Sequence, residues 1–128
     1  IPFDTRFVTR WFDNLIDRGY TPILAHPERY FVFHQNHDLI DEILNRGVLF
    51  QVNIDSLIGE NGTTAQYMSI DMVRRGIASL IASDAHDLTY RHTRIIEKLN
   101  QLPYEITEEA VEKCLIEIPT KIVNNQNI

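Results

Sequence analysis

The sequence predicts an α/β protein with a parallel sheet, and two observations support this class. Three glycines, Gly19, Gly47 and Gly76, recur at intervals of 28 and 29 residues, and each closes a helix-like stripe of apolar residues. A short, nearly continuous apolar run follows each glycine. Strands that are apolar throughout are typical of parallel sheets buried on both faces. The repeated helix–glycine–strand unit therefore predicts parallel strands with flanking helices.

The first unit combines a helix over residues 4–18 with a strand over residues 20–25. Gly19 between them suits the position after a helix end, where positive φ is required. His26 and Pro27 end the predicted strand. The helix is predicted because apolar residues recur at spacings of three and four. These residues are Phe3, Phe7, Val8, Trp11, Phe12, Leu15 and Ile16.

The second and third units repeat this order. A helical stripe over residues 39–44 precedes Gly47 and a strand over residues 48–52 that ends at Asn53. After a glycine-rich turn at residues 59–62, a helix over residues 64–75 precedes Gly76 and a strand over residues 77–82. These runs have the lengths of ordinary helices and strands.

Two more helices are predicted downstream, over residues 93–99 and 107–118. In the second, Thr107 is an N-cap candidate, and Glu108 and Glu109 suit the positive end of a helix dipole. Pro119 is expected to break this helix before a last short turn.

Composition limits the class of partner and the compartment. The net charge of −6 and the pI near 5.2 leave no basic surface for a nucleic-acid backbone. No apolar run approaches the roughly 20 residues that span a bilayer, so membrane insertion is not expected. The single cysteine, Cys114, excludes an internal disulfide, and no signal-peptide pattern opens the chain. A cytoplasmic protein is expected.

Candidate site residues follow all three predicted strands. His26 follows the first strand, Asn53 the second, and Asp84 with His86 the third. The carboxyl ends of parallel strands meet at one edge, where α/β proteins build their sites. Imidazole and carboxylate side chains at that edge predict a metal site formed by His26, Asp84 and His86. Alternatively, Asp84 caps the next helix and His86 is a solvated loop residue.

An arginine accompanies each predicted ligand loop. Arg29 lies three residues after His26, and Arg91 lies five residues after His86. The planar guanidinium matches phosphate oxygens, so two arginines beside a metal would bind a phosphomonoester. The alternative for each arginine is a surface ion pair, which for Arg29 would involve Glu28.

Other nucleophiles and ligands find less support in the sequence. His34 and His37 are interpreted as surface residues because no acidic partner accompanies them. Cys114 has Thr120 at the position where a cysteine-based phosphatase needs arginine, so it is interpreted as a core residue. No G-x-S-x-G motif is present. A metal-activated water is therefore the nucleophile that the sequence supports.

Three blocks carry a resemblance to a known family. They are AHPERY from Ala25, QVN from Gln51 and SDAH from Ser83, followed by Arg91. In this order and spacing the chain resembles the bacterial manganese-dependent protein-tyrosine phosphatases of the polymerase-and-histidinol-phosphatase (PHP) superfamily, which belong to capsule and exopolysaccharide gene clusters. The resemblance implies a distorted (β/α)7 TIM-like barrel that holds up to three Mn²⁺ ions, with iron or zinc as alternatives.

The resemblance also assigns roles to individual residues. It implies that His26, Asp84 and His86 are metal ligands and that Arg29 and Arg91 bind phosphate, and it leaves Asn53 without a role. The family's H-x-H ligand pair on its first strand is absent. Residues 1–128 are therefore expected to be the C-terminal portion of a single barrel domain, inactive alone. Such a portion is expected to associate with its missing half or with another copy of itself.

Three functions follow from this resemblance. The first is hydrolysis of phosphotyrosine on a tyrosine autokinase of polysaccharide biosynthesis, which the AHPERY block favours. The second is hydrolysis of a small phosphorylated metabolite such as histidinol phosphate. The third is a non-catalytic barrel remnant that binds a partner; the retained ligands His26, Asp84 and His86 argue against it, because unpaired buried polar groups reduce stability.

Overall fold

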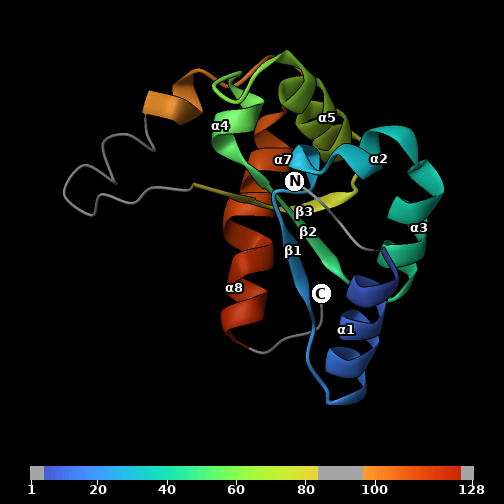
Figure 1. The fold of residues 1–128 in the computed structure, drawn as a ribbon. Helices are drawn as coiled ribbons and strands as arrows, with labels where there is room; N and C mark the ends of the chain where they lie inside the picture. The colour runs from blue at the N-terminus through green and yellow to red at the C-terminus, as the bar shows by residue number, and fades with distance from the viewer. Residues whose placement is uncertain (1–4, 84–96, 125–128) are drawn as a thin grey trace.

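A computed structural model describes residues 5–83 and 97–124, and its centre is a parallel sheet (Figure 1). Within these ranges the sheet has three strands, β1 (Ile23–Ala25), β2 (Leu49–Asn53) and β3 (Ala78–Ala82), in the order β1-β2-β3. Ile23 pairs with Leu49, and Gln51 pairs with Leu80. The predicted α/β class with a parallel sheet is confirmed.

The strands begin later than predicted, because the residue after the glycine closes the helix. The N–H of Tyr20 donates to the carbonyl of Leu15 at 2.9 Å, and the N–H of Ile77 donates to the carbonyl of Met72 at 2.9 Å. These are the long bonds of a Schellman helix ending. The backbone of these residues therefore completes the preceding helix before the sheet ladder starts.

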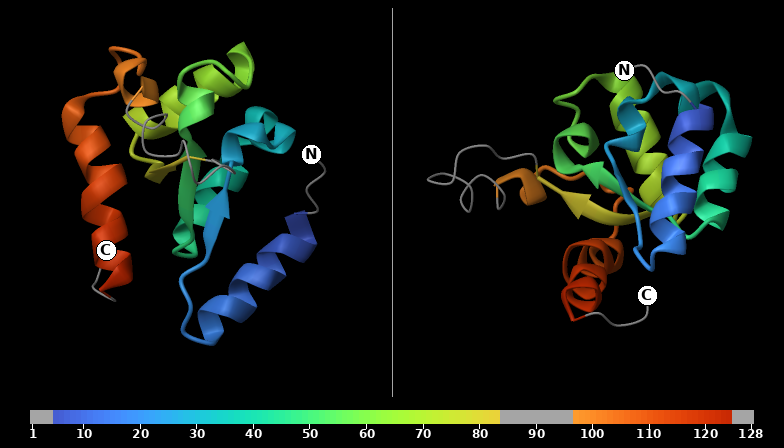
Figure 2. Two further views of the ribbon diagram at one scale, coloured as in Figure 1. Left: turned by 90° about the vertical axis from the view of Figure 1, so that its left-hand side faces the viewer. Right: turned by 60° about the horizontal axis from the view of Figure 1, so that its bottom comes forward.

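Helices cover the two faces of the sheet unequally (Figure 2). The predicted helices α1 (Thr5–Asp17), α3 (His37–Asn45) and α5 (Thr63–Arg74) are present, and α5 packs against β2 and β3. On the opposite face, the C-terminal helical segment packs against β3. This second face is therefore partly open along β1 and β2.

Three short helical turns at the carboxyl ends of the strands were not predicted. The 3-10 turn η1 (Pro27–Arg29) and helix α2 (Phe31–Gln35) follow β1, and α4 (Ile54–Leu57) follows β2. Each has only three to five residues. A periodicity of 3.6 residues cannot be recognised over so short a segment.

The C-terminal helix begins as predicted but does not break at Pro119. Thr107 caps α7 (Glu108–Glu112), its hydroxyl accepting from the N–H of Ala110 at 3.1 Å. The chain then continues through a π-helical turn η2 (Lys113–Glu117) into α8 (Ile118–Val123). In the π turn the N–H of Ile118 donates five residues back, to the carbonyl of Lys113. This wider turn accommodates Pro119 at the start of α8, where its missing N–H is tolerated.

The core lies between the sheet and helices α1, α3 and α5. Phe33 and Phe50 are fully buried, with ring centroids 5.8 Å apart. Cys114 is buried, as predicted, and its thiol lies 3.7 Å from the carbonyl of Ala78. In the described ranges, no helix combines the length and apolarity that crossing a bilayer requires.

Candidate functional site

His26 occupies a strained backbone position at the carboxyl end of β1. Its φ of 56° and ψ of 44° lie in the left-handed region, and it is the one non-glycine residue with positive φ in the described ranges. Its place before Pro27 would favour an extended backbone instead. Such strain has a free-energy cost of about 1–3 kcal/mol and is concentrated at functional sites. The backbone strain therefore identifies His26 as a candidate site residue, independently of its side chain.

The ring of His26 also carries an unused polar atom. Its Nδ1 is buried and has no hydrogen-bond partner among the described residues. The backbone N–H of the same residue donates to the carbonyl of Gln51 at 2.9 Å, which holds the histidine beside β2. A buried imidazole nitrogen normally finds a hydrogen-bond partner or a metal. The atom is of the kind that ligates manganese, iron or zinc.

Glu28 is a buried carboxylate in the same loop, with 1% of its surface exposed. Its Oε1 accepts from the backbone N–H of Asn53 at 3.0 Å, whereas its Oε2 is buried and lacks a partner among the described residues. The surface ion pair suggested for Arg29 with Glu28 is wrong, because Glu28 points inward and Arg29 is exposed. Glu28 was missed as a site residue; its position two residues after His26 was the available signal.

Asn53 connects the end of β2 to α4 and is 2% exposed. Its side-chain oxygen accepts from the N–H of Asp55 at 2.9 Å, which is an N-cap arrangement. Since its own N–H donates to Glu28, Asn53 joins the loop after β1 to the loop after β2. The structure thus gives Asn53 a structural role at the carboxyl edge.

Lys98 approaches the same edge from a helical turn at residues 97–100. Its ammonium group donates to Oδ1 of Asp55 in a short ion pair, and Oε2 of Glu60 lies 4.0 Å away. Lys98 is buried, with 8% of its surface exposed. Lysine is seldom buried without a charged partner, so this pair holds residue 98 against the loop after β2.

Of the predicted site residues, His26 and Arg29 lie together in the loop after β1. Asp84, His86 and Arg91 lie outside the described residues, so the convergence of His26, Asp84 and His86 stays a prediction. Within residues 5–83 and 97–124, no three histidine, cysteine or acidic side chains are placed to share a metal. The described part of the site thus contributes two unused donor atoms, Nδ1 of His26 and Oε2 of Glu28.

The two other histidines of interest differ from one another. His34 was predicted to be a surface residue, but it is half-buried and its Nε2 lies 3.0 Å from the carbonyl oxygen of Glu28. Because a carbonyl only accepts, the ring of His34 donates there and supports the loop that carries Glu28. His37 is exposed, as predicted.

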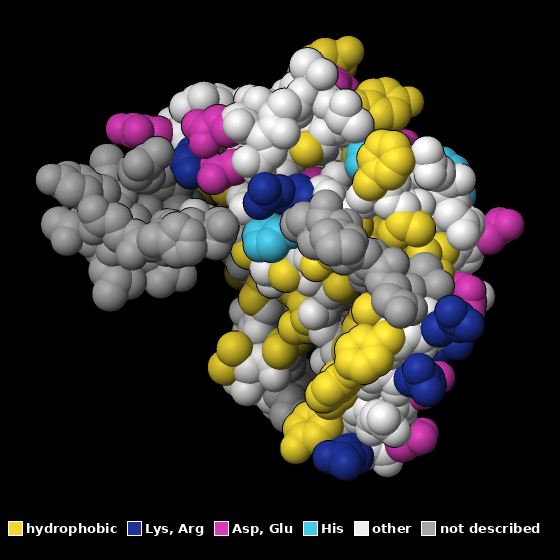
Figure 3. All heavy atoms as spheres, in the orientation of Figure 1, with side chains coloured by type: hydrophobic (Ala, Val, Ile, Leu, Met, Phe, Trp, Pro, Cys, Tyr) yellow, Lys and Arg dark blue, Asp and Glu magenta, His cyan; other side chains and the backbone are white. Residues whose placement is uncertain are grey.

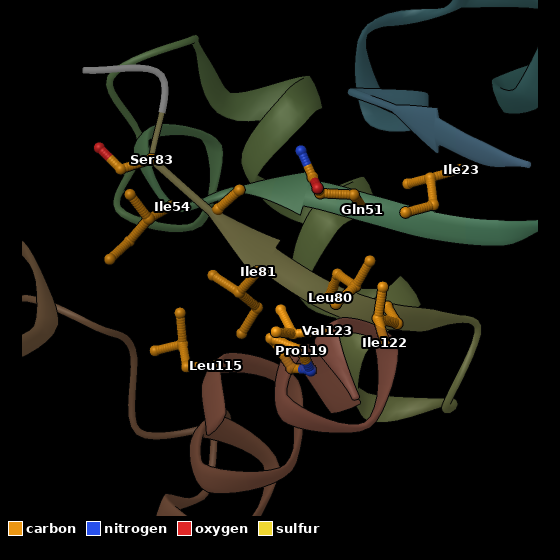
Figure 4. Close-up of a pocket in the computed structure, with 11 residues that line it drawn as sticks. Ile23, Gln51, Ile54, Leu80, Ile81, Ser83, Leu115, Pro119, Ile122 and Val123 are labelled. Carbon is orange, nitrogen blue, oxygen red and sulfur yellow. The ribbon is translucent and has the colours of Figure 1, made fainter. Parts of the chain in front are cut away.

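An apolar cleft of about 430 Å³ opens on the sheet face that α8 covers incompletely. Figure 4 shows side chains of the sheet on one side of it and side chains of η2 and α8 on the other. The lining is largely aliphatic and carries no acidic or basic side chain, and it reaches the carboxyl ends of β2 and β3 at Ile54, Ala82 and Ser83. Its residues include Ile23, Gln51, Leu80, Leu115, Pro119 and Ile122.

A parallel α/β unit with a strained histidine and a buried carboxylate at its carboxyl edge resembles the class of α/β proteins that build their sites at strand ends. Comparison with known families agrees with this class and makes it specific. The chain belongs to the CpsB/CapC family of capsular polysaccharide synthesis, whose model matches residues 3–124.

The alignments with two individual relatives cover most of this chain but less than half of each relative's own length. CapC of Staphylococcus aureus is 36% identical over 109 residues, covering 85% of this chain and 43% of CapC. The tyrosine-protein phosphatase YwqE of Bacillus subtilis is 34% identical over 119 residues, covering 85% of this chain and 47% of YwqE. The chain therefore spans about half the length of the curated relatives that it matches.

A solved structure leads to the same family. It comes from work on YwqE of Bacillus subtilis and CpsB of Streptococcus pneumoniae, which are described as unique metal-dependent tyrosine phosphatases. The match has a TM-score of 0.74 and 28% identity, and it covers 100% of this chain and 50% of the solved chain. The fold of this chain is thus that of half of such a protein.

Proposed function

We propose that this chain is part of a metal-dependent phosphoesterase that hydrolyses phosphotyrosine on a protein. The proposed substrate is a tyrosine autokinase of polysaccharide biosynthesis. Family membership supports this choice, because the relatives YwqE and CpsB are named tyrosine-protein phosphatases. The same names favour a phosphotyrosine substrate over a small metabolite.

His26 is the single observation that carries the proposal. A strained backbone and a buried, unpartnered Nδ1 are both unfavourable for stability, and they occur in one residue at the sheet edge where α/β proteins bind ligands. A partner-binding remnant without catalysis would gain nothing from either feature. The third function considered for this chain is therefore disfavoured.

In this proposal His26, Asp84 and His86 hold the metal, for which manganese is the first choice and iron or zinc are alternatives. The intact enzyme would hold up to three ions. The unpartnered Nδ1 of His26 fits such a ligand set. A bound metal would polarise the phosphoryl oxygens and lower the pKa of a bound water.

Arg29 is proposed to bind the phosphate together with Arg91. The side chain of Arg29 is exposed on η1, three residues from His26, and it forms no ion pair with another residue in the described ranges. An exposed guanidinium is available to a phosphate group on a protein substrate. Its two parallel N–H groups would fix the orientation of the phosphate oxygens.

We further propose that residues 1–128 form the C-terminal portion of a distorted (β/α)7 barrel. The apolar cleft beneath the sheet supports this, as does the exposed face of α1 that carries Phe7 and Trp11, 54% and 53% exposed. Figure 3 shows hydrophobic side chains gathered over α1 and on the side where α8 lies. Apolar patches of this kind mark surfaces that another polypeptide covers. The remaining half of the barrel is the proposed occupant, in preference to a second copy of this chain.

The cytoplasm is the proposed compartment. The single cysteine, Cys114, is a buried free thiol, which fits a reducing environment. A tyrosine autokinase would also expose its phosphotyrosines where ATP is available.

The test uses the full-length protein that contains this chain, a phosphotyrosine peptide and titrated Mn²⁺. We expect Arg29→Ala to lower kcat/KM by about 10-fold or more, because a charge-assisted phosphate contact is lost. Bound metal, measured by elemental analysis, should stay unchanged. Loss of the metal in Arg29→Ala would contradict the assigned role, and an inactive wild-type protein would contradict the function.

A second experiment tests the missing half. Residues 1–128 purified alone are expected to hydrolyse p-nitrophenyl phosphate at no more than a trace rate, because an incomplete ligand set does not fix the geometry of the nucleophilic water. Adding the separately expressed N-terminal portion should restore turnover. Full-length rates from residues 1–128 alone would show that the site is complete without it.

A further inference from the structure

Four residues at the carboxyl edge form one continuous chain of polar contacts. It runs from Glu28 to the N–H of Asn53, from the side chain of Asn53 to the N–H of Asp55, and from the carboxylate of Asp55 to Lys98. We call this set, Glu28, Asn53, Asp55 and Lys98, the edge relay. Its contacts link three segments that are far apart in the sequence.

The first contact links the loops after β1 and β2. Oε1 of Glu28 accepts from the backbone N–H of Asn53 at 3.0 Å, and both residues are at least 98% buried. A bond between an ionisable carboxylate and a buried N–H is among the stronger hydrogen bonds in proteins. Because Glu28 lies two residues from His26, this contact also limits the movement of the histidine loop relative to β2.

The second contact orients the carboxylate that receives Lys98. The side-chain oxygen of Asn53 holds the N–H of Asp55 at 2.9 Å, which fixes the first turn of α4. The side chain of Asp55, 21% exposed, then pairs with the side chain of Lys98, which is 10% exposed. An ion pair so shielded from solvent is screened less than a surface pair.

The third contact brings in the segment downstream of β3. Lys98 is the second described residue after residues 84–96, the stretch in which the sequence places Asp84, His86 and Arg91. Its ion pair fixes Lys98 against Asp55 of α4. The edge relay therefore connects the loops after β1 and β2 with the described segment that begins at residue 97.

We infer that the edge relay is a positioning device for the metal and phosphate site, with Glu28, Asn53, Asp55 and Lys98 as positioning residues. The inference rests on the proposed function. Each contact acts between the ends of different elements, so the relay sets the spacing between loops. Spacing of this kind decides whether ligands carried by separate loops reach one ion.

The experiment compares three variants of the full-length protein. Asp55→Asn and Lys98→Met each remove one charge of the part-buried ion pair, and Glu28→Gln removes the charge at the other end of the relay. The matched control is Asp71→Asn, which removes an exposed ion pair with Arg75 at 3.4 Å on α5. Mn²⁺ affinity is measured by calorimetry, the melting temperature of the metal-free protein by calorimetric scanning, and kcat/KM with a phosphotyrosine peptide.

We expect each relay variant to weaken Mn²⁺ binding by about 10- to 100-fold, as loss of a contact that orients ligands does elsewhere. The control should change the affinity less than about 2-fold, because exposed ion pairs contribute little. If the melting temperatures fall while Mn²⁺ affinity and kcat/KM stay at wild-type values, the relay contributes only to folding stability. That result would overturn the inference.

Coupling between the two ends gives a second readout. Glu28 and Lys98 share no contact within the described residues. If their roles were independent, the fold-losses of Mn²⁺ affinity in Glu28→Gln and Lys98→Met would multiply in the double variant. A relay predicts that the double variant loses markedly less affinity than that product. Multiplicative losses would overturn the proposed connection.

The outcomes separate this inference from the proposed function. A wild-type protein that binds Mn²⁺ but hydrolyses no phosphotyrosine would refute the function, and the affinity measurements would still decide the role of the relay. A wild-type protein that binds neither Mn²⁺ nor Fe²⁺ nor Zn²⁺ would overturn both.

Discussion

The two ends of the sheet are built differently although the same unit is repeated along the chain. At the amino end, Gly19, Gly47 and Gly76 adopt φ values of 87°, 88° and 73° before the strands begin. A methyl group added at any of them would meet no atom within 4 Å. These glycines are thus required by backbone conformation and not by close packing.

At the carboxyl end the described loops after β1 and β2 differ from one another, and the loop after β1 carries features that oppose stability. A histidine takes the left-handed conformation that glycine takes at the other end, and a buried carboxylate oxygen has no described partner. At the amino end, no described residue other than glycine has a positive φ and no described polar side-chain atom is buried without a partner. The carboxyl end retains strained and unsatisfied groups, which is expected where a site binds something.

The largest expected effect comes from removing the imidazole at the carboxyl end. His26→Ala should weaken Mn²⁺ binding to the full-length protein by at least about 100-fold, because a direct ligand matters more than the outer contacts that orient it. Calorimetric titration measures this. His37→Ala, which removes an exposed histidine, is the control and should bind Mn²⁺ as the wild type does. Equal affinities for the two variants would show that His26 is no ligand.

A substitution at the amino end should affect stability without affecting metal binding. Gly47→Ala places a side chain at φ 88°, which lowers the free energy of unfolding by about 1–2 kcal/mol. Urea denaturation measures the loss, and Mn²⁺ affinity should remain unchanged. A loss of Mn²⁺ affinity in Gly47→Ala would show that the two ends of the sheet are coupled. It would contradict the separate roles assigned to them.

The backbone strain at His26 can be separated from its side chain. His26→Gly should have a free energy of unfolding about 1 kcal/mol higher than His26→Ala, because glycine tolerates the left-handed conformation. Both variants lack the imidazole and should bind Mn²⁺ equally weakly. If His26→Ala is as stable as His26→Gly in urea denaturation, the loop relaxes and the backbone of His26 is not held in strain.

The smallest effect concerns Cys114, which lies against the amino end of β3. Burial raises the pKa of the Cys114 thiol, so in the folded chain it stays protonated to higher pH than in the unfolded chain. The unfolded state then binds fewer protons at alkaline pH, and stability falls as pH rises above about 8.5. Between pH 8 and 9, the free energy of unfolding measured with urea should fall further for the wild type than for Cys114→Ala. The difference between the two decreases should be less than about 1 kcal/mol. Identical pH dependence in the two proteins would show that the thiol ionises freely when folded.

Much of the scaffold could be predicted because its signals are local. Periodic apolar residues indicated α1, α3 and α5, and the glycine after each helix indicated where it ends. The expected break at Pro119 was wrong because a π-helical turn, which depends on packing against β3, absorbs the proline. The short turns η1 and α4 escaped prediction for lack of length.

The sequence by itself determined the parallel α/β class and the presence of His26 and Arg29 at the carboxyl end of a strand, since both follow from the order of apolar runs and the residues that end them. Only the tertiary structure decided that Glu28 points inward to Asn53, that His26 is strained, and that Lys98 pairs with Asp55 across 43 positions. The physical reason is that a hydrogen bond or ion pair between distant segments leaves no periodic pattern in the chain. It depends on how the loops converge once the sheet has formed.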